Sequence, residues 1–261
     1  MITRSTMSRF RQFSIVVIVI LIYIWAFSGL PSIGLKETSV EVVSAIISGI
    51  FSPDWDYVYD PGGEDLLRGL LDTLAIAVLG TIIAAILSIP FAFLAARNIT
   101  KSRAVVGVNK VLLSFIRVFP DIVLALLFIK AVGPGAFAGV LALGIGAIGM
   151  LGKLISESIE NVDLNAREAL IASGANPVKT FIFAVVPQVL TNYFSFVMYR
   201  LEVNMRAATI LGVIGAGGIG TPLIFALSVR NWERVGIILL GIIVMVTLVD
   251  LISSKIRARF T

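Results

Sequence analysis

The sequence predicts an all-α, polytopic membrane protein with about six transmembrane helices. Hydrophobic residues make up 58% of its 261 residues, charged residues make up only 14%, and the mean hydropathy is +1.01. A water-soluble domain carries about 25% charged residues, so this chain has too few to cover a globule in water. The sequence contains no Cys and no His. That composition excludes disulfides, thiol or imidazole catalysis, and the usual zinc and haem sites.

Six apolar runs are long enough to cross a bilayer, whose core needs about 20 helical residues. The first run follows three Arg, and its 18 uncharged residues favour a retained anchor over a cleaved signal peptide. A turn is expected at Gly133-Pro134-Gly135, within the Gly-rich start of the fourth run. The six runs are Phe13–Leu30, Thr73–Ala96, Val105–Ile129, Ala131–Gly152, Phe181–Tyr199 with an extension through Ala207–Ile214, and Val235–Val249.

Between the first two runs, the sequence predicts a short amphipathic helix over Thr38–Phe51 and a surface loop over Ser52–Gly63, rich in Pro, Gly and Asp. We therefore expect two regions. Residues 1–64 would form a membrane anchor helix and an acidic periplasmic segment, and residues 65–261 would form a transmembrane domain of five core helices.

The basic residues predict the orientation, because Lys and Arg collect on the cytoplasmic side of membrane proteins. With both termini in the cytoplasm, thirteen of the 21 basic residues lie in cytoplasmic segments and five lie in outer segments. The first outer loop is acidic, from Glu37 to Asp65. We expect a multi-pass membrane protein with both termini in the cytoplasm, in contact with lipid. Nucleic acid is not expected as a partner, since the basic residues flank apolar runs and form no single solvated face.

The segment 153–180 is the longest cytoplasmic one, and it predicts two helices. The first would run over about Leu154–Ser173 and end at Gly174, where a left-handed cap needs a residue without Cβ. Asn176 would cap the second, with Pro177 at its first position. Small residues beside the turn, such as Ala169, would let another protein approach closely. From the residues alone, an ordinary solvated hairpin fits equally well.

This segment resembles the coupling loop of ABC-importer permeases. The family motif is Glu-Ala-Ala, three residues, Gly, nine residues, Ile, one residue, Leu-Pro. Glu168-Ala169-Leu170, Gly174 and Pro187 keep its spacing, with Leu170, Ala184 and Val186 replacing Ala, Ile and Leu. The resemblance implies a type I ABC importer permease fold and a short helix that docks on an ATPase subunit. The residues implied at that contact are Arg167, Glu168, Ala169, Gly174 and Pro187.

Charged residues inside two of the runs predict a polar path. Arg117 and Asp121 are four residues apart, as are Glu202 and Arg206, so the members of each pair can interact on one helical face. Pro120, between Arg117 and Asp121, is expected to bend the helix. Structural salt bridges are one interpretation. The other is a translocation pathway for an anion, favoured by a surplus of Arg over carboxylates. The residues expected along the path are Arg117, Asp121, Arg200, Glu202, Asn204 and Arg206.

The segments Arg117–Asp121 and Tyr199–Gly220 are similar to the phosphonate importer permease branch, whose relatives take phosphite or phosphate. The stretch Gly215-Ala-Gly-Gly-Ile-Gly220 also satisfies the G-x-G-x-x-G dinucleotide fingerprint, but no strand is expected before it. Its glycines instead permit close packing or a flexible turn. By resemblance their location implies an outer gate, made of Gly215, Gly217, Gly218 and Gly220.

The resemblance implies a pore subunit of a bacterial inner membrane and not an enzyme. No cofactor or metal is expected on this chain, which has no Walker A sequence; ATP and Mg²⁺ would bind to partner subunits. The implied partners are a second permease copy, two cytoplasmic ATPase subunits and a periplasmic or lipid-anchored solute-binding protein. Three alternatives stay open: a permease for another small solute, an ion-gradient-driven carrier, and a membrane-embedded hydrolase.

Overall fold

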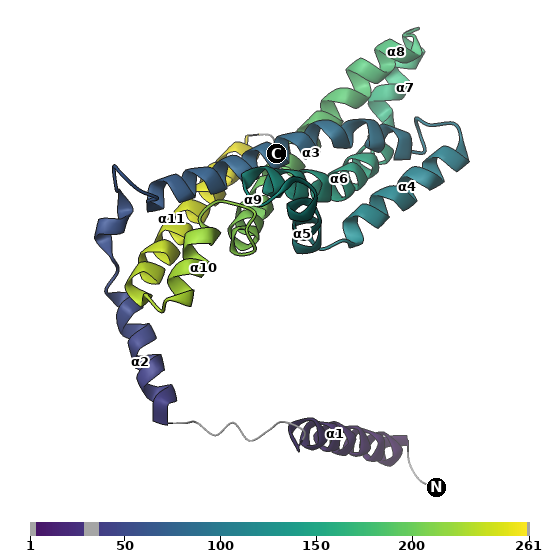
Figure 1. The fold of residues 1–261 in the computed structure, drawn as a ribbon. Helices are drawn as coiled ribbons and strands as arrows, with labels where there is room; N and C mark the ends of the chain where they lie inside the picture. Colours follow the sequence, from purple (N-terminus) through teal and green to yellow (C-terminus); the bar gives the residue numbers. More distant parts are fainter. Residues whose placement is uncertain (1–3, 29–36, 260–261) are drawn as a thin grey trace. The chain divides into compact units, whose positions relative to one another are not determined.

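A computed structural model of the protein describes residues 4–28 and 37–259, and within those ranges it contains helices and no strand (Figure 1). By its internal contacts the chain divides into two units, residues 1–46 and 47–261. Five of the described helices are long and apolar enough to cross a membrane, and the count rises to six if a bent pair is one span. The predicted all-α membrane fold is confirmed.

The first unit contains α1 (Arg4–Ser28) and the beginning of α2 (Glu37–Phe51). An 18-residue apolar window, Arg11–Ser28, makes α1 long enough for a span. The predicted end of the first run, at residues 29 and 30, lies outside the described residues. The helix predicted over Thr38–Phe51 is confirmed as α2.

The second unit is a bundle whose long helices alternate with short ones. Local residues explain where several helices begin: Asp65 caps α3 by accepting from the Arg68 amide at 2.7 Å, and Asn231 caps α11 through the Arg234 amide at 3.0 Å. After the 3₁₀ turn η1 (Trp55–Val58), the order is α3 (Leu66–Ala95), α4 (Arg103–Val118), α5 (Asp121–Val132), α6 (Ala136–Glu160), α7 (Leu164–Ala172), α8 (Pro177–Thr180), the π-helical η2 (Phe181–Val185), α9 (Val186–Val213), α10 (Gly220–Ser228) and α11 (Trp232–Arg257).

Helix α6 is central, since it packs against α3, α4, α5 and α9. Glycines let its neighbours approach closely. A Cβ on Gly149 would lie 2.7 Å from the Leu113 carbonyl oxygen of α4, and one on Gly146 would lie 2.6 Å from Asp121 Oδ1 of α5. On the α3 side, a Cβ on Gly80 would lie 2.9 Å from the Leu143 Cβ. These contacts hold the α6 backbone against three helices at once.

The bend expected at Pro120 in the third predicted span, Val105–Ile129, is confirmed. The span is broken into α4 and α5, which meet at an angle of 86°. Pro120 is the cause: it has no amide hydrogen, and it forces the preceding Phe119 into an extended conformation (φ −72°, ψ 124°). The expected turn at Gly133–Gly135 is confirmed, because Gly133 and Gly135 have φ of 95° and 132°.

The segment before α3 packs against α11 and α3. Tyr57 of η1 is buried, its ring lies 4.5 Å from the Arg234 guanidinium carbon, and Asp54 forms an ion pair of 3.6 Å with Arg234. Burial raises the pKa of the Tyr57 phenol. The helix α10 was not predicted from the sequence, because nine residues between a glycine turn and Arg230 do not make a span. It ends with Arg230 in the left-handed region at φ 56°.

Candidate functional site

The predicted coupling loop forms a helical elbow made of α7, a turn and α8. The turn is a Schellman motif: the Ala175 amide donates to the Leu170 carbonyl at 3.0 Å, and the Gly174 amide donates to the Ile171 carbonyl at 2.9 Å. Gly174 has φ of 79°, and a Cβ there would meet nothing within 4 Å. The backbone angle, and not lack of space, therefore requires glycine. Asn176 caps α8 through the Lys179 amide at 2.8 Å, as predicted.

The first helix of this loop differs from the prediction. The expected helix over Leu154–Ser173 is interrupted, because α6 ends at Glu160 and α7 begins at Leu164. Asp163 is the local reason: its carboxylate accepts from the Asn165 amide at 3.0 Å and starts a new helix. The break makes α7 a separate short element that can point away from α6.

The candidate contact residues lie on the exposed surface of this elbow. Arg167, Glu168 and Ala169 of α7 are exposed, and so are Gly174 and, at the start of α9, Pro187. Beside them, a groove of about 580 Å³ lies between the α3–α4 connection and the elbow. It is lined by Asn98, Ile99, Val162, Arg167, Ile171, Ala175, Pro177, Val178, Thr180, Phe181 and Val185. The elbow has the exposed, small-residue surface that a docking helix needs.

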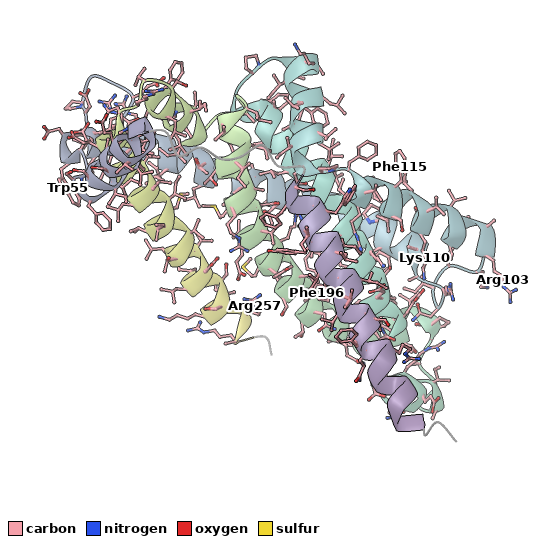
Figure 2. The ribbon with its side chains drawn as sticks, turned by 90° about the horizontal axis from the view of Figure 1, so that it is seen from below. Trp55, Arg103, Lys110, Phe115, Phe196 and Arg257 are labelled. Atoms are coloured by element: carbon pink, nitrogen blue, oxygen red, sulfur yellow. The ribbon has the colours of Figure 1, made fainter. Side chains whose placement is uncertain are left out.

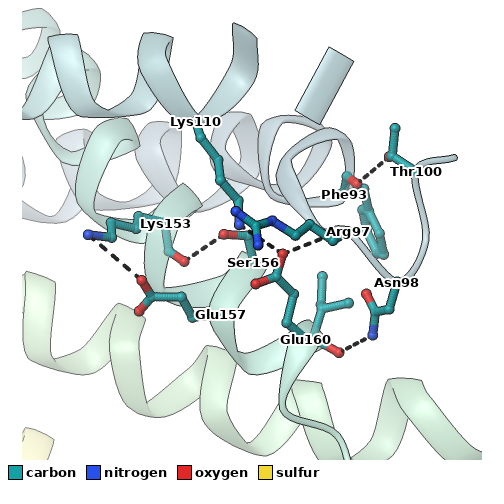
Figure 3. A network of polar contacts seen from close by, with 10 residues as sticks. Phe93, Arg97, Asn98, Thr100, Lys110, Lys153, Ser156, Glu157 and Glu160 are labelled. Carbon is teal, nitrogen blue, oxygen red and sulfur yellow. Dashed lines mark hydrogen bonds and ion pairs between the residues drawn. The ribbon is translucent and has the colours of Figure 1, made fainter. Parts of the chain in front are cut away.

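A polar network fixes the α6 end from which the elbow extends (Figure 3). The Glu160 carboxylate accepts from Lys110 Nζ at 2.9 Å and from the Arg97 amide at 2.8 Å. Asn98 Nδ2 donates to the Ile159 carbonyl at 2.6 Å. These contacts join α6 to the α3–α4 connection. Sequence reasoning missed Glu160, because its partners are 50 and 63 residues away.

The intramembrane charges pair differently from the prediction. The pair Arg117–Asp121 was wrong: the break at Pro120 removes the common helical face, and Asp121 instead pairs with Arg200 of α9, with an Nη2–Oδ2 distance of 3.3 Å. The pair Glu202–Arg206 was also wrong. Each of these residues pairs with α11, Glu202 with Arg257 at 2.9 Å and Arg206 with Asp250 at 3.5 Å. Sequence reasoning missed both α11 partners.

Helix α9 therefore carries polar residues that tie it to three other helices. Arg200 reaches α5, Glu202 reaches α11, and Asn204 Nδ2 donates to Thr81 Oγ1 of α3 at 2.8 Å. All three of these side chains are buried. A buried polar group requires a partner, so these contacts fix the rotation of α9 in the bundle. About one and a half turns of one helix thus set its place against α3, α5 and α11.

Two arginines of the predicted path are exposed. Arg206 is half exposed, and its pair with Asp250 is the longest of the three intramembrane pairs, at 3.5 Å. Arg117, in the last turn of α4, is exposed and forms no ion pair with any residue that the structure describes. Of the three arginines in the predicted path, Arg117 is the one that no described carboxylate compensates.

The glycine segment after α9 is a packed turn, and it has no strand before it. Gly215, Gly217 and Gly218 have φ of 95°, 82° and 76°. The Gly135 amide donates to the Gly215 carbonyl at 2.9 Å. A Cβ on Gly217 would lie 2.7 Å from the Ala136 amide nitrogen. Gly220, which begins α10, touches Gly212. The left-handed backbone and the close approach to α6 both require glycine here.

A bundle of long apolar helices with a separate, exposed helical elbow is the architecture of a multi-pass membrane protein. The chain belongs to the family described as binding-protein-dependent transport system inner membrane component, which matches residues 88–260. The predicted resemblance to ABC-importer permeases is confirmed, and this protein is a multi-pass inner membrane component of such a system.

Relatives that are named as transport permeases support the same family. The chain is 39% identical over 249 residues to the phosphite transport system permease protein PtxC of Stutzerimonas stutzeri, covering 95% of this chain and 88% of the relative. It is 39% identical over 233 residues to the phosphate-import permease protein PhnE of Mycolicibacterium smegmatis, covering 89% of this chain and 42% of that longer protein.

Solved structures show the same fold. The inward-facing MetNI methionine ABC transporter matches with a TM-score of 0.64 at 18% identity, covering 75% of this chain and 96% of that one. An amino acid ABC transporter matches with a TM-score of 0.64 at 23% identity, covering 74% and 93%. The type I importer permease fold predicted from the motif spacing is therefore confirmed.

Proposed function

We propose that the chain forms the translocation pathway of an ATP-driven importer for a phosphorus oxyanion, namely phosphonate, phosphite or phosphate. The observation that carries this proposal is that one arginine of the predicted path, Arg117 of α4, has no carboxylate partner among the described residues. Three carboxylates balance Arg200, Arg206 and Arg257, while Arg117 is exposed without an ion-pair partner among the described residues. An uncompensated guanidinium inside a membrane attracts an anion. The names of the phosphite and phosphate relatives agree with that chemistry.

In this proposal the predicted path residues have two roles. Arg117 and the half-exposed Arg206 contact the passing anion, because guanidinium groups match phosphorus oxyanions geometrically. The remaining predicted path residues, Asp121, Arg200, Glu202 and Asn204, hold α9 in place. Gly215, Gly217, Gly218 and Gly220 would form the outer gate, at the end of α9 away from the elbow.

The elbow would be the part of the permease that the ATPase subunit contacts and moves. Arg167, Glu168, Ala169 and Gly174 would contact a cytoplasmic ATPase subunit, with Pro187 at the start of the helix that transmits the motion. ATP and Mg²⁺ would bind to the ATPase subunits, so this chain would not itself be an enzyme. A second copy of the permease, two ATPase subunits and an external solute-binding protein would complete the importer, with both termini in the cytoplasm and residues 1–64 as anchor and periplasmic segment.

Uptake by cells that express the chain with the ATPase and binding-protein subunits of its own operon tests the proposal. Labelled phosphite, phosphate and 2-aminoethylphosphonate are compared in wild type, Arg117→Gln and the control Lys130→Gln. Losing one charged contact to the anion is worth about 1.5–3 kcal/mol, so Arg117→Gln is expected to lower uptake by about tenfold or more. The control should transport normally. Equal uptake by Arg117→Gln and wild type would contradict the assignment.

Two further outcomes separate the alternatives. If uptake persists when ATP is depleted while the proton gradient is kept, the chain is an ion-gradient-driven carrier. If none of the three phosphorus compounds is taken up but the ATPase subunit co-purifies with the chain, it is a permease for another small solute.

A further inference from the structure

A basic pocket lies where α3 ends and α4 begins, beside the end of α6 that carries the elbow. It has a volume of about 610 Å³. Its walls are Arg97, Thr100, Lys101, Arg103, Val106, Gly107 and Lys110. Four of these seven side chains are cationic. None of the residues predicted for the pathway or the coupling elbow lines this pocket.

The pocket carries a surplus of positive charge. Its neighbouring carboxylate, Glu160, is bound by Lys110 Nζ at 2.9 Å. Within the described residues, the side chains of Arg97, Lys101 and Arg103 form no ion pair. Arg103 also begins α4, whose amino end contributes a partial positive charge. Three cations and a helix amino terminus therefore share one cavity.

The pocket wall is held in shape by the network of Figure 3. Thr100 Oγ1 donates to the Phe93 carbonyl at 2.9 Å, and Asn98 Nδ2 donates to the Ile159 carbonyl at 2.6 Å. These contacts fix the α3–α4 connection to α3 and α6, so the backbone that carries the cations does not need to be ordered on binding. A preformed site loses less conformational entropy when a ligand binds.

The face of α4 next to the one that lines the pocket is an exposed apolar stripe. Val108, Val111, Phe115 and Val118 are 68%, 69%, 61% and 78% exposed. Their spacing of three and four residues places them on one side of the helix. In Figure 2, Arg103 extends from the free end of α4, and Phe115 stands out from the same helix further along. A cationic end followed by an apolar face matches a molecule with an anionic head and hydrocarbon chains.

We propose that this pocket binds the headgroup of an anionic phospholipid, of the phosphatidylglycerol class, with its acyl chains along the exposed face of α4. Phosphate oxygens would contact Lys101, Arg103 and Arg97. Basic pockets between membrane helices select anionic headgroups in this way. Because Glu160 joins the pocket to the end of α6, the bound lipid would brace the base of the elbow. The site does not depend on the identity of the transported solute.

Native mass spectrometry of the full-length chain, released from nanodiscs of equal phosphatidylglycerol and phosphatidylcholine, tests the proposal. The variant is Lys101→Gln/Arg103→Gln, which leaves the Lys110–Glu160 pair intact. The control is Lys255→Gln/Arg259→Gln, which removes two exposed cations outside the pocket. Each surface cation contributes about 1 kcal/mol to binding of anionic lipid, so the variant should retain about thirtyfold less phosphatidylglycerol, while the control matches wild type.

Equal losses in the variant and the control, or no loss in either, would overturn the proposal. Competition distinguishes the source of the anion: 10 mM inorganic phosphate or glycerol 3-phosphate should leave the retained lipid unchanged, and displacement by either would show a free-anion site instead. The same spectra report oligomeric state. A dimer that carries no lipid, and that still forms in the Lys101→Gln/Arg103→Gln variant, would show that a second copy of the chain covers α4. That result would overturn the proposal. Circular dichroism checks that the variant is folded, and a second variant, Lys101→Gln alone, should lose about fivefold.

Discussion

Replacing Asp121 with Asn removes the carboxylate that compensates Arg200 inside the bundle. The Arg200 side chain is only 9% exposed, and its Nη2 lies 3.3 Å from Asp121 Oδ2. Its other recorded side-chain contact is with Met150 Sδ at 3.8 Å, and its Nε is buried without a partner. After Asp121→Asn, a nearly buried guanidinium would remain with a neutral amide in place of its counter-ion.

The burial of each partner sets the expected cost. Breaking a buried ion pair by removing one member costs about 3–5 kcal/mol. Asp121 is 26% exposed, so water can reach the pair, and we expect the lower end, about 3 kcal/mol, for Asp121→Asn. Arg200→Gln leaves the carboxylate, which can hydrate through its exposed part, so about 2 kcal/mol is expected. The double variant should cost about 3 kcal/mol, which gives a coupling energy of about 2 kcal/mol.

The assay is reversible unfolding of the purified chain by SDS in mixed micelles, followed by circular dichroism. Arg117→Gln is the matched control, because Arg117 precedes Asp121 by four residues yet forms no ion pair with it in the described structure. Its effect should add to that of Asp121→Asn within about 0.5 kcal/mol. A coupling energy above 1 kcal/mol between Arg117 and Asp121, with none between Arg200 and Asp121, would refute the arrangement around α9.

Three further predictions concern single residues. Gly146→Ala should destabilise the chain by about 1–3 kcal/mol in the same unfolding assay, because the new Cβ would lie 2.6 Å from Asp121 Oδ1. By contrast, Gly107→Ala, with nothing within 4 Å, should stabilise α4 by about 0.5–1 kcal/mol; equal effects would contradict the packing. Gly174→Val should weaken co-purification of the ATPase subunit while Gly174→Asn retains it, because Asn accepts a left-handed backbone. Glu168→Lys should reduce the same co-purification without changing thermal stability, since Glu168 is exposed; a lowered melting temperature would instead make it structural.

The features that the sequence predicted well depend on neighbours along the chain. Asn176 caps α8, which begins one residue later. Gly174 follows α7 and terminates it, because its left-handed backbone angle cannot continue the helix. Apolar runs likewise depend only on local composition. Such features need no knowledge of the fold, because the atoms that decide them are within a few residues.

The ion pairs could not be predicted in the same way. Arg200 pairs with a residue 79 positions away, and Glu202 with one 55 positions away. The i, i+4 rule applies only where one continuous helix contains both residues. Pro120 breaks that condition for Asp121. For Glu202 the helix is continuous, but Arg257 of α11 lies within 2.9 Å and takes the carboxylate. A buried charge inside a span therefore indicates that a partner exists, and the packing of the helices determines which residue it is.

The position of the ion pairs on α9 connects the two candidate sites. From Pro177 to Val213 the chain is helical for 37 residues, with the π-helical turn η2 joining the elbow to α9. Movement of the elbow therefore reaches the level of Arg200 and Arg206 without crossing a flexible loop. A rotation of α9 would have to break the contacts of Arg200, Glu202 and Asn204 together, because they lie within five residues and hold three different helices. That requirement favours two discrete positions of α9 over a continuous range. Weakening one contact, as in Asp121→Asn, should then change how readily the helix switches as well as how stable the bundle is.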